Sequence, residues 1–373
     1  MTVPSYRAAI VAGVCATLLG VGLQRFAYSP LLPAMVHADW LTGGEAGTLG
    51  AVNFAGYLIG AAIAPSAGRQ LGLRPALRLG MAGATLCLLL CAIRGPLLWL
   101  VPWRTLAGIA GGILMVLAGP AVQAAAPLRM RGLAGGLLFA GVGLGIMASA
   151  VIVPALLTSG VSATWVALAV AGLLLTVLSW NRWPDVPPPP LGRRPALIGP
   201  VGRLVLAYGL ASVAATAYMA WWPDYIARGL GQGTSMGALG WLLYGFGITI
   251  GPALCGWLAD RIGGQRAFAI TLLVQLVPAS LPLLLDSWVW LAIAAVSGGI
   301  TAAGLTGLTL IRAREIADDQ AAGIWRLGTV AWAAAQMASG FVMAWAYAAT
   351  GSHASVFAIG LVGAVLALIV GRK

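Results

Sequence analysis

Arg25 places a permanent positive charge inside an otherwise apolar run of the chain, from Ala8 to Val36. A guanidinium at the centre of a membrane helix is about 2.5 to 3.5 kcal/mol unfavourable, so such a residue normally faces a protein interior or a water-filled cavity. Its planar fork of N–H donors matches the geometry of a carboxylate. We therefore expect Arg25 to line a path for a solute and to contact that solute.

Two more polar residues are predicted at the depth of Arg25. Counting about 1.5 Å per residue from the outer ends of their helices, Arg104 and Asn53 fall in its layer. Two guanidiniums there, without an acid nearby, must be hydrated, capped by carbonyls or neutralised by an anion, which favours an anionic substrate. The equally weighted alternative is that Arg104 binds carbonyls of the first helix, which Pro30 and Pro33 should bend or end.

Amphipathic aromatic residues complete the predicted substrate site. One helix face in the second half of the chain carries, at i, i+4, i+7 and i+11, Trp325, Thr329, Trp332 and Gln336. The other candidate contacts are Tyr28, Tyr57, Tyr218 and Tyr244. Trp221 and Trp222 are instead expected to be anchors at the membrane boundary, the commoner role of tryptophan there.

Titratable residues are predicted only at helix ends or in loops. The nine acids are Asp39, Glu45, Asp185, Asp224, Asp260, Asp286, Glu315, Asp318 and Asp319. A proton-driven transporter usually has such a group within the membrane. A coupled proton therefore stays open, with Glu45 and Asp224 as candidates ahead of His37 and His353. Each of the four is otherwise a solvated end residue.

The four cysteines all lie in apolar runs, so we expect no disulfide framework. Cys87 and Cys91 share a helix face and in principle suit a soft metal, but small buried hydrophobic residues are the stronger interpretation. We predict no metal and no cofactor.

Composition indicates an integral membrane protein. Of the 373 residues, 60% are hydrophobic and 8% charged, whereas a soluble domain has about 25% charged residues. Apolar runs of about 20 residues favour an all-α protein over a β-barrel. We count twelve spans: 8–36, 45–65, 76–94, 97–126, 132–157, 163–180, 203–227, 236–258, 267–285, 288–311, 322–349 and 354–371.

The longest break between spans divides the chain into two halves. It contains Pro187 to Pro190 and the pair Arg193 and Arg194, and a proline run cannot continue a helix. We predict pseudo-symmetric six-helix bundles at 1–180 and 203–373, joined by a cytoplasmic linker at 181–202. Loops on the cytoplasmic side of a membrane carry an excess of Lys and Arg. If both termini are cytoplasmic, only Arg94 and Arg228 fall in loops on the outer side.

Two loops at equivalent places in the halves resemble each other. Gly256 to Gly263 matches the G-x-x-x-D-R-x-G signature of the major facilitator superfamily, and Ser66 to Pro75 is a degraded copy with Arg69 in place of the aspartate. A carboxylate against a helix N-terminus and arginines against facing carboxylates would form a conformational gate. The alternative is a basic turn that only fixes topology. The predicted gating residues are Arg69, Gly72, Gly256, Asp260, Arg261 and Gly263.

Longer strings resemble the YbfB/YjiJ family of bacterial major facilitator proteins. They are Gln24–Pro33, Asn53–Gly60, Gly132–Gly136 with Phe139–Gly145, and Trp241–Gly256. Arg104 to Gly108 also resembles the superfamily's R-x-x-x-G element. The resemblance implies the MFS fold, a central cavity lined by spans 1, 4, 7 and 10, and a transport function. It does not indicate which substrate is transported.

We therefore predict a multi-pass transporter of the bacterial inner membrane that moves a small organic solute, anionic by preference, by alternating access. The alternative within transport is efflux of multidrug or amphipathic compounds. A membrane sensor or enzyme is less favoured, because no soluble segment is long enough and two loop histidines without a buried acid offer no catalytic arrangement. The net charge of +12 lies in alternate loops, so we expect no nucleic acid partner. We also expect contact with membrane lipids, and we expect the chain to be a monomer.

Overall fold

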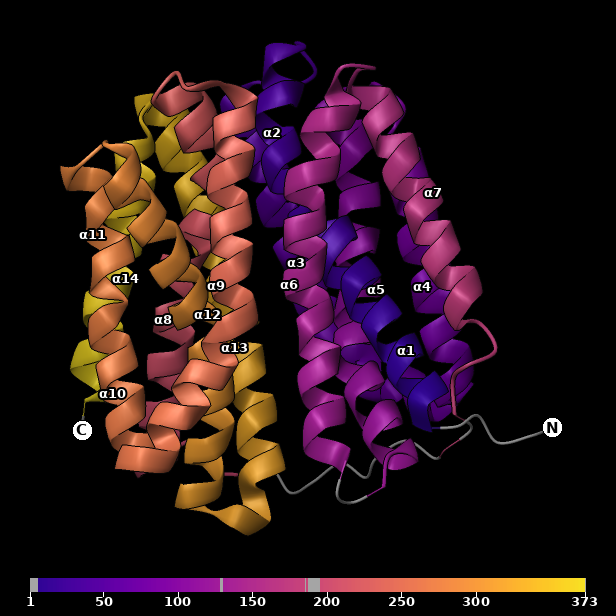
Figure 1. The fold of residues 1–373 in the computed structure, drawn as a ribbon, viewed down its shortest axis with the longest axis vertical. Coiled ribbons are helices and arrows are strands. Elements are labelled where there is room, and N and C mark those ends of the chain that lie inside the picture. The colour runs from indigo at the N-terminus through magenta and orange to yellow at the C-terminus, as the bar shows by residue number, and fades with distance from the viewer. Residues whose placement is uncertain (1–5, 128–129, 185, 187–194, 373) are drawn as a thin grey trace. The chain divides into compact units, whose positions relative to one another are not determined.

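The computed structural model describes residues 6–127, 130–184, 186 and 195–372. Within these residues, 12 helices are long and apolar enough to cross a membrane, which confirms the predicted number (Figure 1). The prolines from Pro187 to Pro190 and the pair Arg193 and Arg194 of the predicted linker lie outside the described residues.

The chain forms two compact units. The first comprises Met1–Thr42 and Val52–Pro190, and the second comprises Gly43–Ala51 and Leu191–Lys373. The helices of the first half are α1 (Tyr6–Thr17), η1 (Leu18–Phe26), α2 (Tyr28–His37), α3 (Gly43–Leu71), α4 (Leu73–Leu90), α5 (Leu97–Ala125), α6 (Arg131–Leu157) and α7 (Val161–Ser179). Those of the second half are α8 (Gly199–Asp224), η3 (Tyr225–Gly229), α9 (Gly233–Ile262), α10 (Gly264–Val274), α11 (Leu276–Leu284), α12 (Trp288–Ile316), η4 (Asp318–Gln320), α13 (Ala321–Thr350) and α14 (His353–Gly371).

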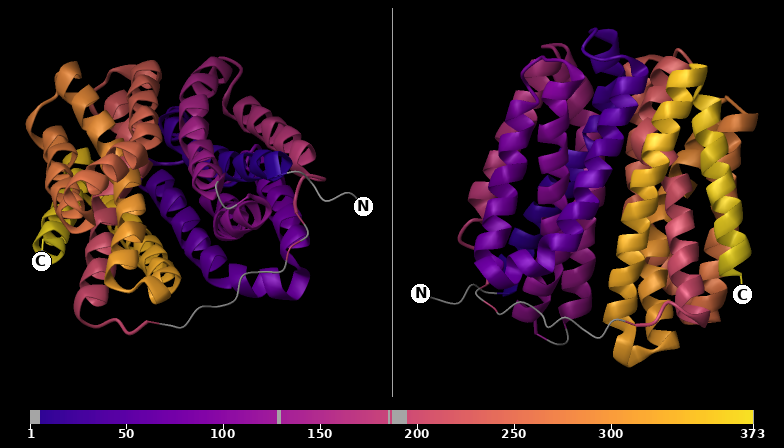
Figure 2. Two further views of the ribbon diagram at one scale, coloured as in Figure 1. Left: turned by 60° about the horizontal axis from the view of Figure 1, so that its bottom comes forward. Right: turned by 180° about the vertical axis from the view of Figure 1, so that it is seen from behind.

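The first span runs from Tyr6 to His37 and contains α1 and α2, coloured indigo in Figure 1; Figure 2 shows two further views in the same colours. It changes from α-helix to the wider π-helix over Leu18–Phe26, and Ala27 separates this stretch from α2. Pro30 lies in the first turn of α2, where its missing N–H removes no helical hydrogen bond. The helix does not end at Pro30 or Pro33, since α2 continues to His37; the irregular backbone precedes both prolines and carries Arg25.

Glycines bring two helix pairs into backbone contact, one in each unit. In the first, a Cβ added at Gly56 of α3 would collide with the carbonyl oxygen of Thr105 on α5. In the second, a Cβ at Gly247 of α9 would collide with the carbonyl oxygen of Val296 on α12. Both members of the second pair lie 191 positions after their counterparts. Small residues allow close helix approach in membranes, so the two units contain the same packing element.

Candidate functional site

Arg25 is buried in the first unit with its guanidinium against aromatic rings. It is 6% exposed, so the side chain does not lie on the surface of the molecule. The guanidinium carbon lies 4.6 Å from the ring centres of both Phe54 and Tyr57 on α3 and 5.2 Å from that of Phe26. Such contacts stabilise a buried cation through the negative faces of the rings. A carboxylate would instead bind the N–H groups in the plane of the guanidinium.

A polar network beside Arg25 ties the irregular first span to α3 and α5. The Nη1 of Arg104 donates to the carbonyl oxygen of Gln24 at 2.6 Å, and the Gln24 side chain donates to the carbonyl oxygen of Ala107. The Nδ2 of Asn53 donates to the carbonyl oxygen of Arg104 at 2.9 Å and to the Oε1 of Gln24 at 3.4 Å. Arg104 therefore caps a carbonyl of the first helix, as the alternative interpretation expected.

Two atoms of this network keep unused hydrogen-bonding capacity. The Oδ1 of Asn53 and the Nε of Arg104 are buried and have no hydrogen-bond partner among the described residues. Both side chains are 1% exposed. Buried polar atoms are normally satisfied by protein or by an ordered water, so these two atoms are candidates for contact with a small polar molecule.

No carboxylate occurs in the helices that carry the two arginines. The only acids before residue 180 are Asp39, after α2, and Glu45, in the first turn of α3. Arg104 instead lies over Tyr28, 4.5 Å from its ring centre, and over Trp165 at 5.9 Å. The first unit therefore stabilises its buried guanidiniums with carbonyls and aromatic faces.

The predicted contacts from the second half are all buried within the second unit. Tyr218 stacks on Trp222 and Tyr244 at 4.6 and 5.7 Å, and its hydroxyl donates to the carbonyl oxygen of Pro278 at 2.7 Å. On α13, Trp332 packs 4.6 Å from Tyr208, and Gln336 contacts the sulfur of Met219 at 3.0 Å. Tyr218 and Tyr244 thus form one aromatic cluster, whereas Trp332 and Gln336 join α13 to α8.

The two predicted gating loops share one backbone conformation. Gly72 before α4 and Gly263 before α10 have φ of 86° and 83°, a region that favours glycine. Asp260 is exposed, and Arg261 lies 4.0 Å over Trp257. It is Glu315 of α12 that accepts the hydrogen bond from the first N–H of α10, at 2.8 Å from Gly264.

The remaining gating residues have less specific surroundings. Arg69 is exposed and its Nη2 donates to the Oγ of Ser66 at 3.2 Å. At Gly256 an added Cβ would meet no atom within 4 Å. The surroundings of Arg69 and Gly256 by themselves assign no conformational role to either residue.

This arrangement of glycines, buried arginines and paired turns agrees with a family comparison. A model of the family described as "Uncharacterised MFS-type transporter YbfB" matches residues 17–372. The chain belongs to this family. The resemblance read from the sequence is confirmed, and the protein is a multi-pass membrane protein of an MFS transporter family, which implies a small-molecule substrate. No curated protein matches the chain.

Solved structures show the same fold. The chain is similar to a bacterial homologue of the human lysosomal transporter Spinster, inward-facing and unoccupied, with a TM-score of 0.71 and 15% identity over 98% of this chain and 94% of that one. It is also similar to a peptide transporter POT in complex with sulfate, with a TM-score of 0.75 and 14% identity over 96% and 95%. Likeness at these identities shows the fold alone.

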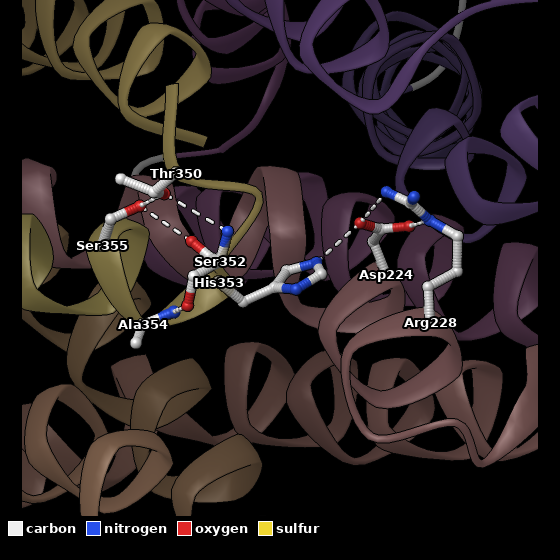
Figure 3. A network of polar contacts seen from close by, with 7 residues as sticks. All are labelled: Asp224, Arg228, Thr350, Ser352, His353, Ala354 and Ser355. Atoms are coloured by element: carbon white, nitrogen blue, oxygen red, sulfur yellow. Dashed lines mark hydrogen bonds and ion pairs between the residues drawn. The ribbon is translucent and has the colours of Figure 1, made fainter. Parts of the chain in front are cut away.

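The sequence-based expectation for the end of α8 was wrong. Asp224 is not a solvated end residue but is 0% exposed. It forms an ion pair with Arg228 at 2.5 Å and accepts a hydrogen bond from the Nε2 of His353 at 2.8 Å (Figure 3). Trp221 and Trp222 are also fully buried, so they are not boundary anchors.

The local sequence around Asp224 did not predict this cluster. Asp224 and Arg228 are four residues apart, a spacing that suits an ion pair, but His353 comes from α14, far along the chain. Gln24 was missed for the same reason, because its partners lie on α3 and α5. In both places packing between distant helices, not periodicity, creates the polar contact.

Proposed function

We propose that this transporter moves a small organic anion across the bacterial inner membrane by alternating access. The observation that carries the proposal is Arg25, a guanidinium buried in the irregular part of the first span in a helix without acids. A carboxylate-bearing solute brings a negative charge and accepts in-plane hydrogen bonds from a guanidinium.

The proposed roles of the other residues follow from their contacts. Arg25 binds the carboxylate, with the rings of Tyr57 and Phe54 packed against its guanidinium. Arg104 and Gln24 hold the π-helical backbone in place, and Asn53 offers its unsatisfied Oδ1 to a polar group of the solute. From the second half, Tyr218, Tyr244, Trp332 and Gln336 remain proposed contacts for the apolar part of the solute, and Tyr28 for the first half.

The proposed gate consists of the two turns before α4 and α10. We retain Asp260, Arg261 and Arg69 as candidates and add Glu315, because it already joins α12 to the start of α10. The proposed orientation has both termini in the cytoplasm, as the arginine distribution favours, and the proposed bundles are joined by the linker at 181–202. We propose that the chain works as a monomer.

The test is ligand-dependent thermal stability of the detergent-purified protein. The probes are benzoate, phenylacetate, succinate and gluconate, with tetraphenylphosphonium and ethidium as cationic compounds. A carboxylate present at ten times its Kd is expected to raise the Tm by about 3 °C, because binding stabilises only the folded state. Arg25→Gln should abolish this shift and Arg25→Lys should reduce it, since lysine lacks the planar fork.

The matched control is Arg94→Gln, which removes an exposed arginine that donates to the carbonyl oxygen of Asp39 at 2.8 Å. This variant should keep the full carboxylate response. Carboxylate shifts that survive in Arg25→Gln, or shifts with the cations alone, contradict the anion proposal.

Efflux of amphipathic compounds is the second candidate, and one observation favours it. Trp222, Tyr218, Tyr244 and Trp241, in that order, form a continuous series of stacked rings in the second unit, with successive centroid distances of 4.6, 5.7 and 5.2 Å. Aromatic surfaces of this kind bind flat apolar or cationic molecules with little geometric demand. Stabilisation by ethidium that is lost in Tyr218→Ala and kept in Arg25→Gln would select this function.

A further inference from the structure

The Asp224 cluster has a defined protonation pattern. Both oxygens of the carboxylate accept from Arg228, with Nε at 2.5 Å and Nη2 at 2.6 Å, which favours the ionised form. An ionised carboxylate only accepts hydrogen bonds, so the Nε2 of His353 carries the hydrogen that it shares with Asp224. In the neutral ring this leaves the lone pair on Nδ1, which is the atom that an added proton must occupy.

That atom lies beside the protein surface. A Cβ added at Gly229, the last residue of η3, would lie 2.8 Å from the Nδ1 of His353. Gly229 is exposed, although the His353 side chain itself is only 6% exposed. The absence of a side chain at residue 229 therefore gives the proton-accepting nitrogen a short route to solvent.

The ring is held firmly in this position. It is the first residue of α14, and Ser352 caps the helix by accepting a hydrogen bond from the N–H of Ala354 (Figure 3). The ring packs against Tyr347 of α13 at 4.8 Å, Tyr225 of η3 at 5.7 Å and Trp221 of α8 at 6.0 Å. Because the imidazole cannot turn away, protonation must change its interaction with Asp224.

Few other charges surround the ring. At the ends of the surrounding elements nearest the ring, the titratable or charged groups are Asp224 on α8, Tyr225 and Arg228 on η3, Tyr347 on α13, Glu45 in the first turn of α3 and Asp286 after α11. The same helices carry, farther along, Arg203, Tyr208 and Tyr218 on α8, Arg326 on α13, and Tyr57 and Arg69 on α3. Helix α9 has charged residues only at its far end. Tyrosine phenols do not change charge near neutral pH, so the imidazole is the group suited to titrate there.

Protonation of His353 would place two cations on one carboxylate. The cluster of Asp224, Arg228 and neutral His353 has no net charge, and a proton on Nδ1 makes it positive at the N-terminus of α14. A helix N-terminus disfavours a cation, and Arg228 and the imidazolium then compete for Asp224. The proton thus weakens the contact by which η3 is held to α8.

We propose that His353 and Asp224 form the proton-binding site of this transporter, with Arg228 as the counter-ion that the proton loosens. The proposal rests on the proposed transport function, because proton binding becomes coupling only when a solute moves. It assigns the proton to the outer end of the second unit and the solute to Arg25 in the first.

The first test needs no solute. The chain contains two histidines, His37 and His353, so histidine-selective isotope labelling in nanodiscs gives two NMR signals, with exposed His37 as the internal control. We expect the chemical shifts of His353 to change with pH, because Nδ1 is the nitrogen that accepts the added proton. In Asp224→Asn the pH dependence of the His353 signal should change, because the ring loses the carboxylate beside its Nε2, while that of His37 stays the same.

A second variant guards against loss of folding in Asp224→Asn. Gly229→Ala places a methyl group against Nδ1 at an exposed position and should suppress or displace the His353 titration. Two results overturn the proposal. One is a His353 signal that does not change from pH 5 to 8, and the other is a His353 signal whose pH dependence in both variants equals that of the unmodified protein.

The second test measures coupling in proteoliposomes with radiolabelled benzoate. Counterflow exchanges solute without net proton movement, whereas uptake driven by a pH gradient requires it. In His353→Asn the ratio of pH-driven uptake to counterflow should fall at least tenfold. An unchanged ratio overturns the proton site. Absence of benzoate counterflow in the unmodified protein counts against the proposed function instead, and the histidine titration then decides the proton site alone.

Discussion

The two units share a packing scaffold but differ in how they treat buried charge. Gly56 and Gly247 occupy equivalent close contacts, and Gly72 and Gly263 occupy equivalent turns. In the first unit, Arg104 donates to a backbone carbonyl and lies over the ring of Tyr28. In the second, Asp224 is neutralised by Arg228. Backbone packing constrains a duplicated fold strictly, whereas polar side chains are free to diverge.

The equivalence of the close contacts is tested most severely by adding one methyl group. Gly56→Ala and Gly247→Ala should each destabilise the protein by about 3 kcal/mol or prevent folding, because the new Cβ meets a backbone carbonyl that cannot move aside. Thermal unfolding and yield of folded protein measure the effect.

Gly256→Ala is the control for this pair, since nothing lies within 4 Å of its added Cβ. It should change the stability by less than about 0.5 kcal/mol. A large loss in only one of the two close-contact variants would show that the scaffold is not shared.

The difference between the units is tested at Arg104. Arg104→Met keeps an unbranched apolar side chain but leaves the carbonyl oxygen of Gln24 without its donor. We expect a loss of about 2 kcal/mol of unfolding free energy, the typical effect of removing a hydrogen bond to a charged group. Arg94→Met, at an exposed position, should cost less than about 0.5 kcal/mol. Equal Tm values for the two variants would contradict the proposed capping role of Arg104.

The smallest expected effect concerns the paired turns. Gly72→Ala and Gly263→Ala each place a side chain at a φ near 85°, where an L-residue is about 1 to 2 kcal/mol less favourable. Both should lower the Tm by similar amounts. Gly83→Ala, in a helix with open space around its Cβ, should be neutral or stabilising because alanine favours helix. Unequal losses at the two turns would show that one of them is supported by contacts the other lacks.

Much of the fold could be predicted because each membrane helix satisfies its own backbone. A run of apolar residues must form a helix in lipid, so the twelve spans follow from composition, and the two turns follow from their glycines. The irregular backbone of the first span was placed near Pro30 and Pro33, whereas it lies over Leu18–Phe26. Arg104 supports that backbone from another helix, which no local pattern can indicate.

The candidate site was predictable in part. Arg25 is recognisable because a charged residue in an apolar run is energetically costly unless it has a function or a partner. Asn53 and Arg104 were placed at the depth of Arg25 from the rise per residue of a helix. Asp224 and Trp221 were misjudged, since position near a span end predicts exposure only when no other helix covers that end. Here α13 and α14 cover it.

The sequence by itself determined that this protein is a twelve-helix membrane transporter with an arginine in the apolar run of its first span, because hydrophobicity and short motifs act locally along the chain. Only the tertiary structure decided that Arg104 supports a π-helical backbone and that His353 meets Asp224, 129 positions away. Those contacts depend on which helix faces are buried against each other, and burial of a polar group is a property of the packed molecule.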